Sequence, residues 1–169
     1  MRELSIYDPD GEQSLAMEIR KRVSSPVFVC IGTDKVYSDS LGPKVGSLLN
    51  NQMVKPAFVY GLQNSNITAE NLVYCIDFIK QMHPDCQTVV VDAAVGSPEQ
   101  IGKVQISNGG IVPGAATNKN LPTVGDVSIV GIVADKGMAD FYTTNSAKER
   151  LVNRVAQFIV KSIILANVC

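Results

Sequence analysis

The sequence has 169 residues, of which 46% are hydrophobic and 18% charged, and its formal net charge is −1. A chain of this length buries roughly 70% of the surface that it exposes when unfolded, so we expect one domain, residues 1–169. The near-neutral charge argues against a nucleic-acid-binding protein. The one basic cluster, Arg20-Lys21-Arg22, is predicted to be the solvated face of a helix.

The cysteine pattern and the apolar segments predict a cytoplasmic protein. The four cysteines form no CxxC pair and have no histidine at metal-ligand spacing, and no signal peptide is recognisable. The apolar run that begins at Phe158 is interrupted by Lys161 and is too short to span a bilayer. This run predicts a helix that either packs on the protein's own sheet or forms the contact of a homodimer.

In chain order, residues 1–10 are predicted to form a loosely held arm, and helical and β-type segments alternate after it. The helices are predicted over Gly11–Val23, from Leu41 onward, from Thr68 to His83, and from Asn145 or Ser146 onward. The strands are predicted over residues 27–32, 57–62, 88–92, 102–106 and 127–134. The alternating pattern of the fourth indicates an edge or antiparallel strand. This order predicts an α/β fold of three layers, α/β/α, with a mostly parallel sheet.

Local signals place the helix starts. Asp39 or Ser40 is predicted to cap the helix that begins at Leu41. Thr68 is predicted to cap the next helix, with Asn71 in the place of the glutamate of a capping box. The buried stripe of this second helix is predicted to comprise Leu72, Val73, Ile76 and Ile79.

Two aspartates are the main chemical signal. Asp39 lies in the polar loop after strand 27–32, and Asp92 is predicted to lie at the carboxyl end of strand 88–92, where ligands collect in α/β sheets. If the two strands lie close together, repulsion between the carboxylates raises one pKa. One member would then deprotonate a water and the other would protonate a leaving amine. Taken singly, Asp39 is equally consistent with a helix cap and Asp92 with a loop residue.

Other chemistries lack their motifs. No strand is followed by GxGxxG or GxxxxGK, and no GxSxG elbow is present. The single histidine, His83, precedes Pro84 at a predicted helix end, whereas a catalytic zinc normally has three protein ligands. We therefore expect no metal and no cofactor.

Three segments resemble a known family. They are FVCIGTDKVYSDSLGPKVG, VVVDAAVGSPEQIGKVQI and GGIVPGAATNKNLPTVGDVSIVGIV. Together they are similar to the YyaC-like sporulation proteins, small relatives of the germination protease that degrades small acid-soluble spore proteins. More distantly, the layout resembles the hydrogenase-maturation endopeptidases, which implies a phosphorylase/hydrolase-like α/β fold.

The resemblance also implies roles for individual residues. The family proposal for the germination protease is catalysis by two aspartates, which by motif are Asp39 and Asp92. The hydrogenase-maturation relatives place an acidic residue at each of these positions and add a histidine to bind nickel or a similar ion. This chain has no histidine in a matching place.

The glycine-rich loop resembles the PGSGxxN-type loop of the germination protease and is expected to bind substrate. Its small residues would let a substrate backbone approach, and Asn118 and Lys119 would face a developing oxyanion. The expected substrate-binding residues are Asp34, Pro113, Gly114, Ala115, Asn118 and Lys119.

Together these signals favour an aspartate-dependent peptidase of the germination-protease type. It is expected to act on a peptide or small protein, in the cytoplasm of a sporulating cell or forespore, with no nucleic-acid or membrane partner. Two alternatives stay open. One is a non-catalytic relative that binds a peptide or partner protein in the same cleft, and the other is a metal-dependent maturation endopeptidase.

Overall fold

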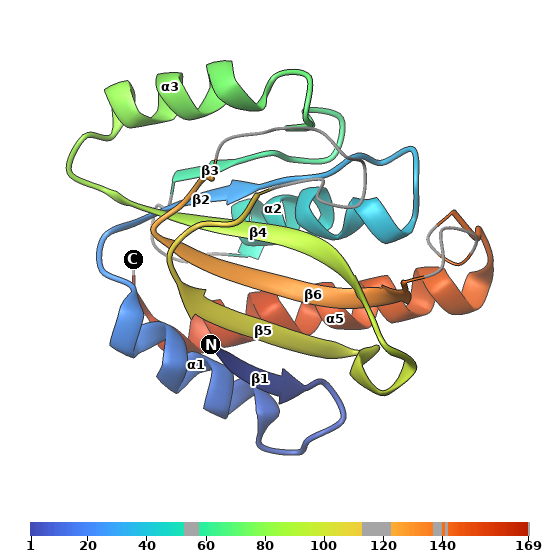
Figure 1. The fold of residues 1–169 in the computed structure, drawn as a ribbon. Helices are drawn as coiled ribbons and strands as arrows, with labels where there is room; N and C mark the ends of the chain where they lie inside the picture. Colours follow the sequence, from blue (N-terminus) through green and yellow to red (C-terminus); the bar gives the residue numbers. More distant parts are fainter. Residues whose placement is uncertain (53–57, 113–122, 137–139, 141, 169) are drawn as a thin grey trace.

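A computed structural model describes residues 1–52, 58–112, 123–136, 140 and 142–168. In this part of the chain, six strands form one sheet in the order β1-β5-β6-β4-β2-β3 (Figure 1). The strands are β1 Arg2–Ser5, β2 Pro26–Cys30, β3 Phe58–Tyr60, β4 Gln87–Gly96, β5 Lys103–Asn108 and β6 Val127–Asp135. The helices are α1 Gly11–Arg22, α2 Leu41–Gln52, α3 Leu72–Met82 and α5 Ser146–Ala166, with short 3-10 turns η1 Ser38–Ser40 and η2 Pro98–Gln100.

The sheet is mostly parallel, as predicted. β3, β2, β4 and β6 run parallel to one another, and β5 is antiparallel to both β6 and β1. The alternating strand predicted over residues 102–106 is thus antiparallel, but it lies inside the sheet because β1 pairs with its far side.

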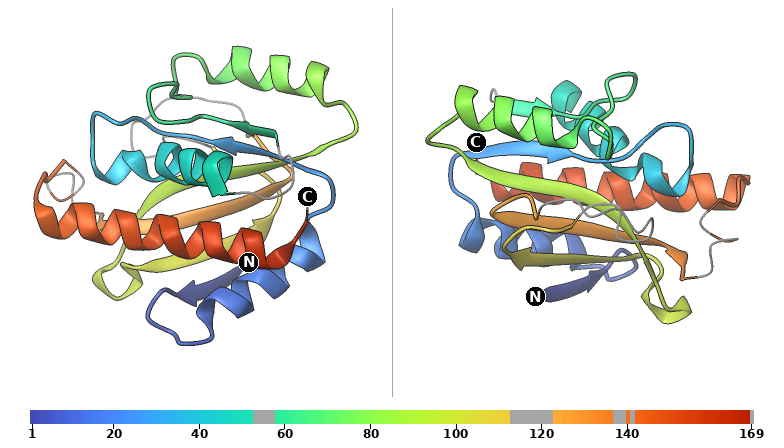
Figure 2. Two further views of the ribbon diagram at one scale, coloured as in Figure 1. Left: turned by 180° about the vertical axis from the view of Figure 1, so that it is seen from behind. Right: turned by 45° about the horizontal axis from the view of Figure 1, so that its top comes forward.

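Helices cover the two faces of the sheet unequally. α1, α2 and α5 pack on one face (Figure 2), where the larger of two buried apolar clusters lies. α3 lies on the opposite face, and its buried side chains meet those of β2 and β4 in the smaller cluster. The three-layer α/β fold is therefore confirmed. On the α3 side, no helix in the described ranges lies over β6, β5 and β1, and we call this area the open face (Figures 1 and 2).

The predicted helices are present, with changes at their ends. α3 ends before His83 and Pro84, as expected, and α5 begins after Asn145, whose side chain accepts a hydrogen bond from the Lys148 N–H at 2.9 Å. Helix α3 begins at Leu72 with Asn71 at its N-cap, so the predicted cap at Thr68 is wrong, although the Asn71 side-chain oxygen accepts from the Thr68 N–H at 2.8 Å.

Three further local predictions are wrong. Residues 1–10 are not simply an arm, because Arg2–Ser5 forms β1. Neither Asp39 nor Ser40 caps α2, because η1 runs directly into that helix through Leu41 in helical geometry. Val73 is 45% exposed, whereas the other members of the predicted α3 stripe, Leu72, Ile76 and Ile79, are buried.

The apolar C-terminal segment packs within the chain. Val155, Ile159 and Ile163 of α5 belong to the larger core, and the carbonyls of Leu165 and Ala166 accept hydrogen bonds from the Arg20 guanidinium. A homodimer stays a prediction, but this helix gives it no specific support. Within the described ranges, no helix is both long and apolar enough to cross a membrane.

Candidate active site

The loop that carries Asp39 closes against the end of β2, and two glycines permit this. Gly32 has φ +139°, and a Cβ there would lie 2.0 Å from the carbonyl oxygen of Asp39. A Cβ on Gly42 would lie 2.0 Å from the carbonyl oxygen of Ile31. The Thr33 N–H also donates to the Asp39 carbonyl at 3.0 Å. These close contacts hold η1 and the start of α2 directly at the carboxyl end of β2. η1 also packs against β4.

Asp92 lies within β4 rather than at its end, which corrects the predicted strand boundary. β4 continues to Gly96 because it keeps pairing with β6 after β2 has stopped. The last β2–β4 pair is Cys30 with Val91, so Asp92 is the first β4 residue beyond the paired end of β2. Because η1 packs against β4, Asp39 comes close enough for its charge to act on Asp92.

Burial dominates the electrostatics of the pair. Asp92 is only 7% exposed, and burial raises its pKa to about 8. A hydrogen bond from the Ala93 N–H, 2.8 Å from Oδ1, lowers this pKa, and the negative charge of Asp39 raises it further. Burial likewise raises the pKa of Asp39 to about 6, against a lowering contribution from the Thr33 backbone.

The two carboxyl groups titrate in order. Asp39 loses its proton first, while Asp92 is still neutral, and the charge so formed then resists ionisation of Asp92. Among the described residues, no basic side chain contributes to either shift. Near pH 7 the site accordingly holds one carboxylate, on Asp39, and one carboxylic acid, on Asp92. Such a pair can accept a proton from one reacting atom and donate a proton to another.

The predicted substrate-binding residue Asp34 holds the loop after β2 to the loop after β3. Its Oδ2 accepts from the Asn64 N–H at 2.9 Å and from the Asn66 side-chain amide at 3.0 Å, and its own N–H donates to Asn66 Oδ1. Its Oδ1 is buried without a partner among the described residues. A role in substrate binding stays a prediction.

The other predicted substrate-binding residues, Pro113, Gly114, Ala115, Asn118 and Lys119, lie outside the described residues. The described ends of their segment pair with each other through Ile111 and Val124. Both residues belong to the smaller core cluster together with Val90. Since Val90 and Asp92 are two residues apart on β4, Ile111 and Val124 lie on the sheet face to which Asp92 points.

The residues present do not fit a transition-metal site. In the described ranges, no group of three or more histidine, cysteine, aspartate or glutamate side chains is placed to hold a metal ion. His83 bonds to the Tyr60 hydroxyl at 2.7 Å and stacks on Phe58, the first residue of β3. Two carboxylates fall short of the three protein ligands of a typical catalytic site, so we derive no step through a metal.

Sequence reasoning missed Ser38, which precedes Asp39 in η1. This residue is fully buried, and its Oγ has no partner within the described part of the chain. A buried hydroxyl without a partner carries an unmet desolvation cost of about 1–3 kcal/mol. The short polar run that contains Ser38 carries no signal that distinguishes it from a helix cap.

A separate shallow hollow of about 630 Å³ lies at the other end of the sheet, before β2 and β4. Its basic side chains have intramolecular partners, since Arg20 binds the end of α5 and both Lys21 and Arg22 pair with Glu18. The hollow is remote from Asp39 and Asp92, and we assign it no chemistry.

The fold is that of a structurally known protease. A [NiFe] hydrogenase maturation protease, HycI from Thermococcus kodakarensis KOD1, superposes with a TM-score of 0.55. The match covers 89% of this chain and 98% of HycI at 18% sequence identity, and it places the chain in the phosphorylase/hydrolase-like α/β class. At this identity the likeness concerns the fold alone.

The sequence relationship is closer. The family described as "Protein of unknown function (DUF1256)" matches residues 8–162, and the chain belongs to it. It is 34% identical over 154 residues to "Uncharacterized protein YyaC" of Bacillus subtilis (strain 168), which covers 90% of this chain and 75% of that protein. The predicted YyaC-like relationship is thereby confirmed.

Proposed function

We propose that this protein is a peptidase in which Asp39 and Asp92 share the activation of water. The observation that carries the proposal is the unequal pair itself. Asp92 of β4 is buried and Asp39 of η1 is half-buried, neither has a cationic partner among the described residues, and their pKa values are raised to about 8 and about 6. An inert buried pair of this kind destabilises the fold, so its presence favours a chemical use.

The proposed reaction uses each carboxyl group once. The Asp39 carboxylate takes a proton from a water molecule, and the oxygen of this water attacks the carbonyl carbon of the scissile peptide bond. The C–N bond then breaks as the Asp92 acid donates its proton to the departing amine nitrogen. Asp39 is left protonated and Asp92 ionised, and return of one proton from Asp39 to Asp92 restores the starting state.

The family resemblance supports the remaining parts of the proposal. Residues 113–119 would bind the substrate backbone and stabilise the oxyanion, with Asn118 and Lys119 as the polar groups. The substrate would be a peptide or small protein in the cytoplasm of a sporulating cell or forespore. The protease fold of HycI supports hydrolysis as the reaction class, although fold alone does not determine function.

The test is a cleavage assay on a mixture of small acid-soluble spore proteins, read by mass spectrometry with and without chelator. Wild type, Asp39→Asn and Asp92→Asn are compared with Asp77→Asn, an exposed aspartate on α3. We expect wild type and Asp77→Asn to cleave regardless of chelator. The two site variants should lose at least about 100-fold in rate while staying folded, because each removes a proton-transfer group.

Full activity of both site variants would contradict the mechanism. Loss of wild-type cleavage on chelation would favour the metal-dependent alternative. Tight binding of peptides without cleavage, unchanged in both site variants, would instead favour a non-catalytic binding protein.

A further inference from the structure

We propose that the open face beside Asp92 binds the substrate polypeptide, with Val130 selecting the side chain next to the scissile bond and Gln105 hydrogen-bonding further along. This inference rests on the proposed function and names the substrate-recognition surface of the same site.

The strand register places these residues in one row across the sheet. Asp92 on β4 pairs with Val130 on β6, Val130 pairs with Gln105 on β5, and Gln105 pairs with Glu3 on β1. Their sequence neighbours Val91, Ile129, Ile106 and Leu4 point into the larger core on the other face. By the alternation of side chains along a strand, the whole row points to the α3 side.

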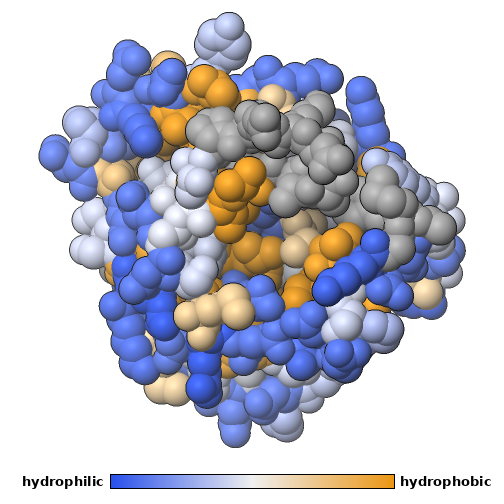
Figure 3. All heavy atoms as spheres, viewed as in Figure 1, coloured by the Kyte–Doolittle hydropathy of each residue, from blue (hydrophilic) through white to orange (hydrophobic). Residues whose placement is uncertain are grey.

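The row is accessible where a sheet residue would normally be covered. Within β6, Val130 is the one residue before Asp135 that is not fully buried, and on β4 Ala94 is also partly exposed. Figure 3 shows apolar side chains gathered in the middle of this face, over β4 and β6, with hydrophilic side chains around them. A partly exposed valine directly beside Asp92 provides an apolar contact of fixed size for a substrate side chain.

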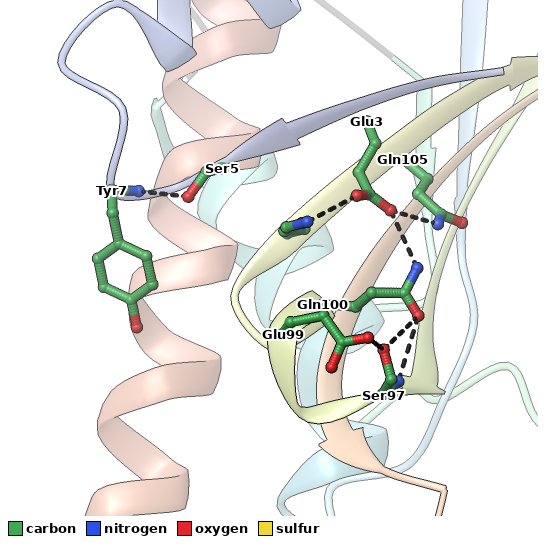
Figure 4. Close-up of polar contacts among 8 residues, drawn as sticks. Glu3, Ser5, Tyr7, Ser97, Glu99, Gln100 and Gln105 are labelled. Atoms are coloured by element: carbon green, nitrogen blue, oxygen red, sulfur yellow. Dashed lines mark hydrogen bonds and ion pairs between the residues drawn. The ribbon is translucent and has the colours of Figure 1, made fainter.

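Hydrogen bonds orient the Gln105 amide (Figure 4). Its Nε2 donates to Glu3 at 2.8 Å, and Glu3 also accepts from Lys103 at 3.0 Å and from Gln100 at 3.2 Å. The hydrogen bond from Gln105 and then that from Lys103 lower the pKa of Glu3, so its carboxylate is ionised and can only accept. Gln105 must therefore turn its NH₂ group toward Glu3 and its carbonyl oxygen away. That oxygen is an oriented acceptor on the open face.

The spacing of the row sets the reach of the substrate. Adjacent strands lie about 4.8 Å apart, so Gln105 lies two strands, or about 10 Å, from Asp92. An extended polypeptide spans this distance in about three residues. The surface therefore fits an extended chain with a small or medium apolar side chain over Val130 and a hydrogen-bond donor one or two residues further on.

The test compares cleavage of a peptide library, made by tryptic digestion of a bacterial proteome, by wild type and three variants. Val130→Phe fills the apolar contact, Val130→Ala enlarges it, and Val73→Phe makes the same exchange at an exposed valine of α3. We expect Val130→Phe to reduce cleavage after medium-sized apolar residues at one subsite by at least about tenfold relative to cleavage after glycine or alanine. Val130→Ala should shift the same subsite toward larger residues, and Val73→Phe should change nothing.

A second readout separates this inference from hydrolysis. The same library is passed over immobilised wild type, Val130→Phe and Val73→Phe, and the retained peptides are identified by mass spectrometry. If wild type cleaves but both Val130 variants keep its profile, the recognition surface is wrong while the peptidase stands. If nothing is cleaved but Val130→Phe alone changes the retained peptides, the surface stands and hydrolysis fails. A library that is neither cleaved nor selectively retained overturns both.

Discussion

Two pairs of ionisable groups lie toward the carboxyl ends of the central strands, and they are built in opposite ways. Asp140 accepts from the Lys148 ammonium at 2.7 Å and from the Asp135 N–H at 2.8 Å, and these hydrogen bonds lower its pKa. In the described part of the chain no cation faces Asp39 or Asp92, and burial raises both pKa values. The first pair is satisfied at neutral pH, whereas the second holds a proton that it can give away.

This contrast separates a structural carboxylate from a chemically poised one. Lys148 also donates to the Val133 carbonyl at 3.2 Å, so it ties β6 to the first turn of α5. A group with such partners gains stability from being charged. Among the described residues, Asp92 accepts a hydrogen bond from the Ala93 N–H alone, and its charged form is disfavoured.

The largest effect is expected on the stability of Asp92→Asn. The folded-state pKa of Asp92 lies above the unfolded value, so its contribution to stability is fully present below about pH 4 and is lost as pH rises to about 8. Asparagine does not ionise, so Asp92→Asn does not lose this free energy of unfolding as pH rises. Urea unfolding should show no advantage of Asp92→Asn at pH 4 and an advantage on the order of 5 kcal/mol at pH 8. An equal difference at both pH values would contradict the raised pKa.

The pH dependence of hydrolysis should be bell-shaped. Activity requires ionised Asp39 and protonated Asp92, so kcat/KM should rise through about pH 6 and fall through about pH 8. Outside this window it should change about tenfold per pH unit. Initial rates on one purified substrate between pH 4 and 10 measure this profile. A rate that keeps rising above pH 9 would mean that Asp92 is not the acid.

The smallest effect concerns the satisfied pair. Lys148→Met leaves the half-exposed Asp140 without its cation and should lower the free energy of unfolding by about 1–2 kcal/mol. Lys161→Met removes an exposed pair with Glu12 and should cost less than about 0.5 kcal/mol. Urea unfolding at pH 7 compares them, and a larger loss for Lys161→Met would overturn the assignment of Lys148 as structural.

The predictable features of this fold depend on local patterns. The periodic apolar positions of α1 and α5 mark helices, and the run around Val90 marks a buried strand. The missed features depend on pairing between distant segments. β1 is four residues long and forms only because β5 offers an edge, and β4 extends past Asp92 only because β6 continues beside it.

The residues of the candidate site also fall into two groups, those that local sequence patterns reveal and those that only strand pairing places. Asp39 and Asp92 stand out in the sequence because a polar residue follows an apolar run. Val130 and Gln105 do not, because their place beside Asp92 depends on strand register across three strands. No single segment encodes that register.

The most direct test of the unequal pair is to measure the pKa values of Asp39 and Asp92. The chemical shifts of the aspartate carboxyl carbons, recorded by ¹³C NMR between pH 3 and 10, report these values. Comparison of wild type with Asp39→Asn and Asp92→Asn assigns the two signals. We expect Asp39 to titrate near pH 6 and Asp92 near pH 8, and Asp39→Asn to lower the pKa of Asp92 by removing a neighbouring charge. Titration of both groups near pH 4, each unaffected by loss of the other, would contradict the central claim.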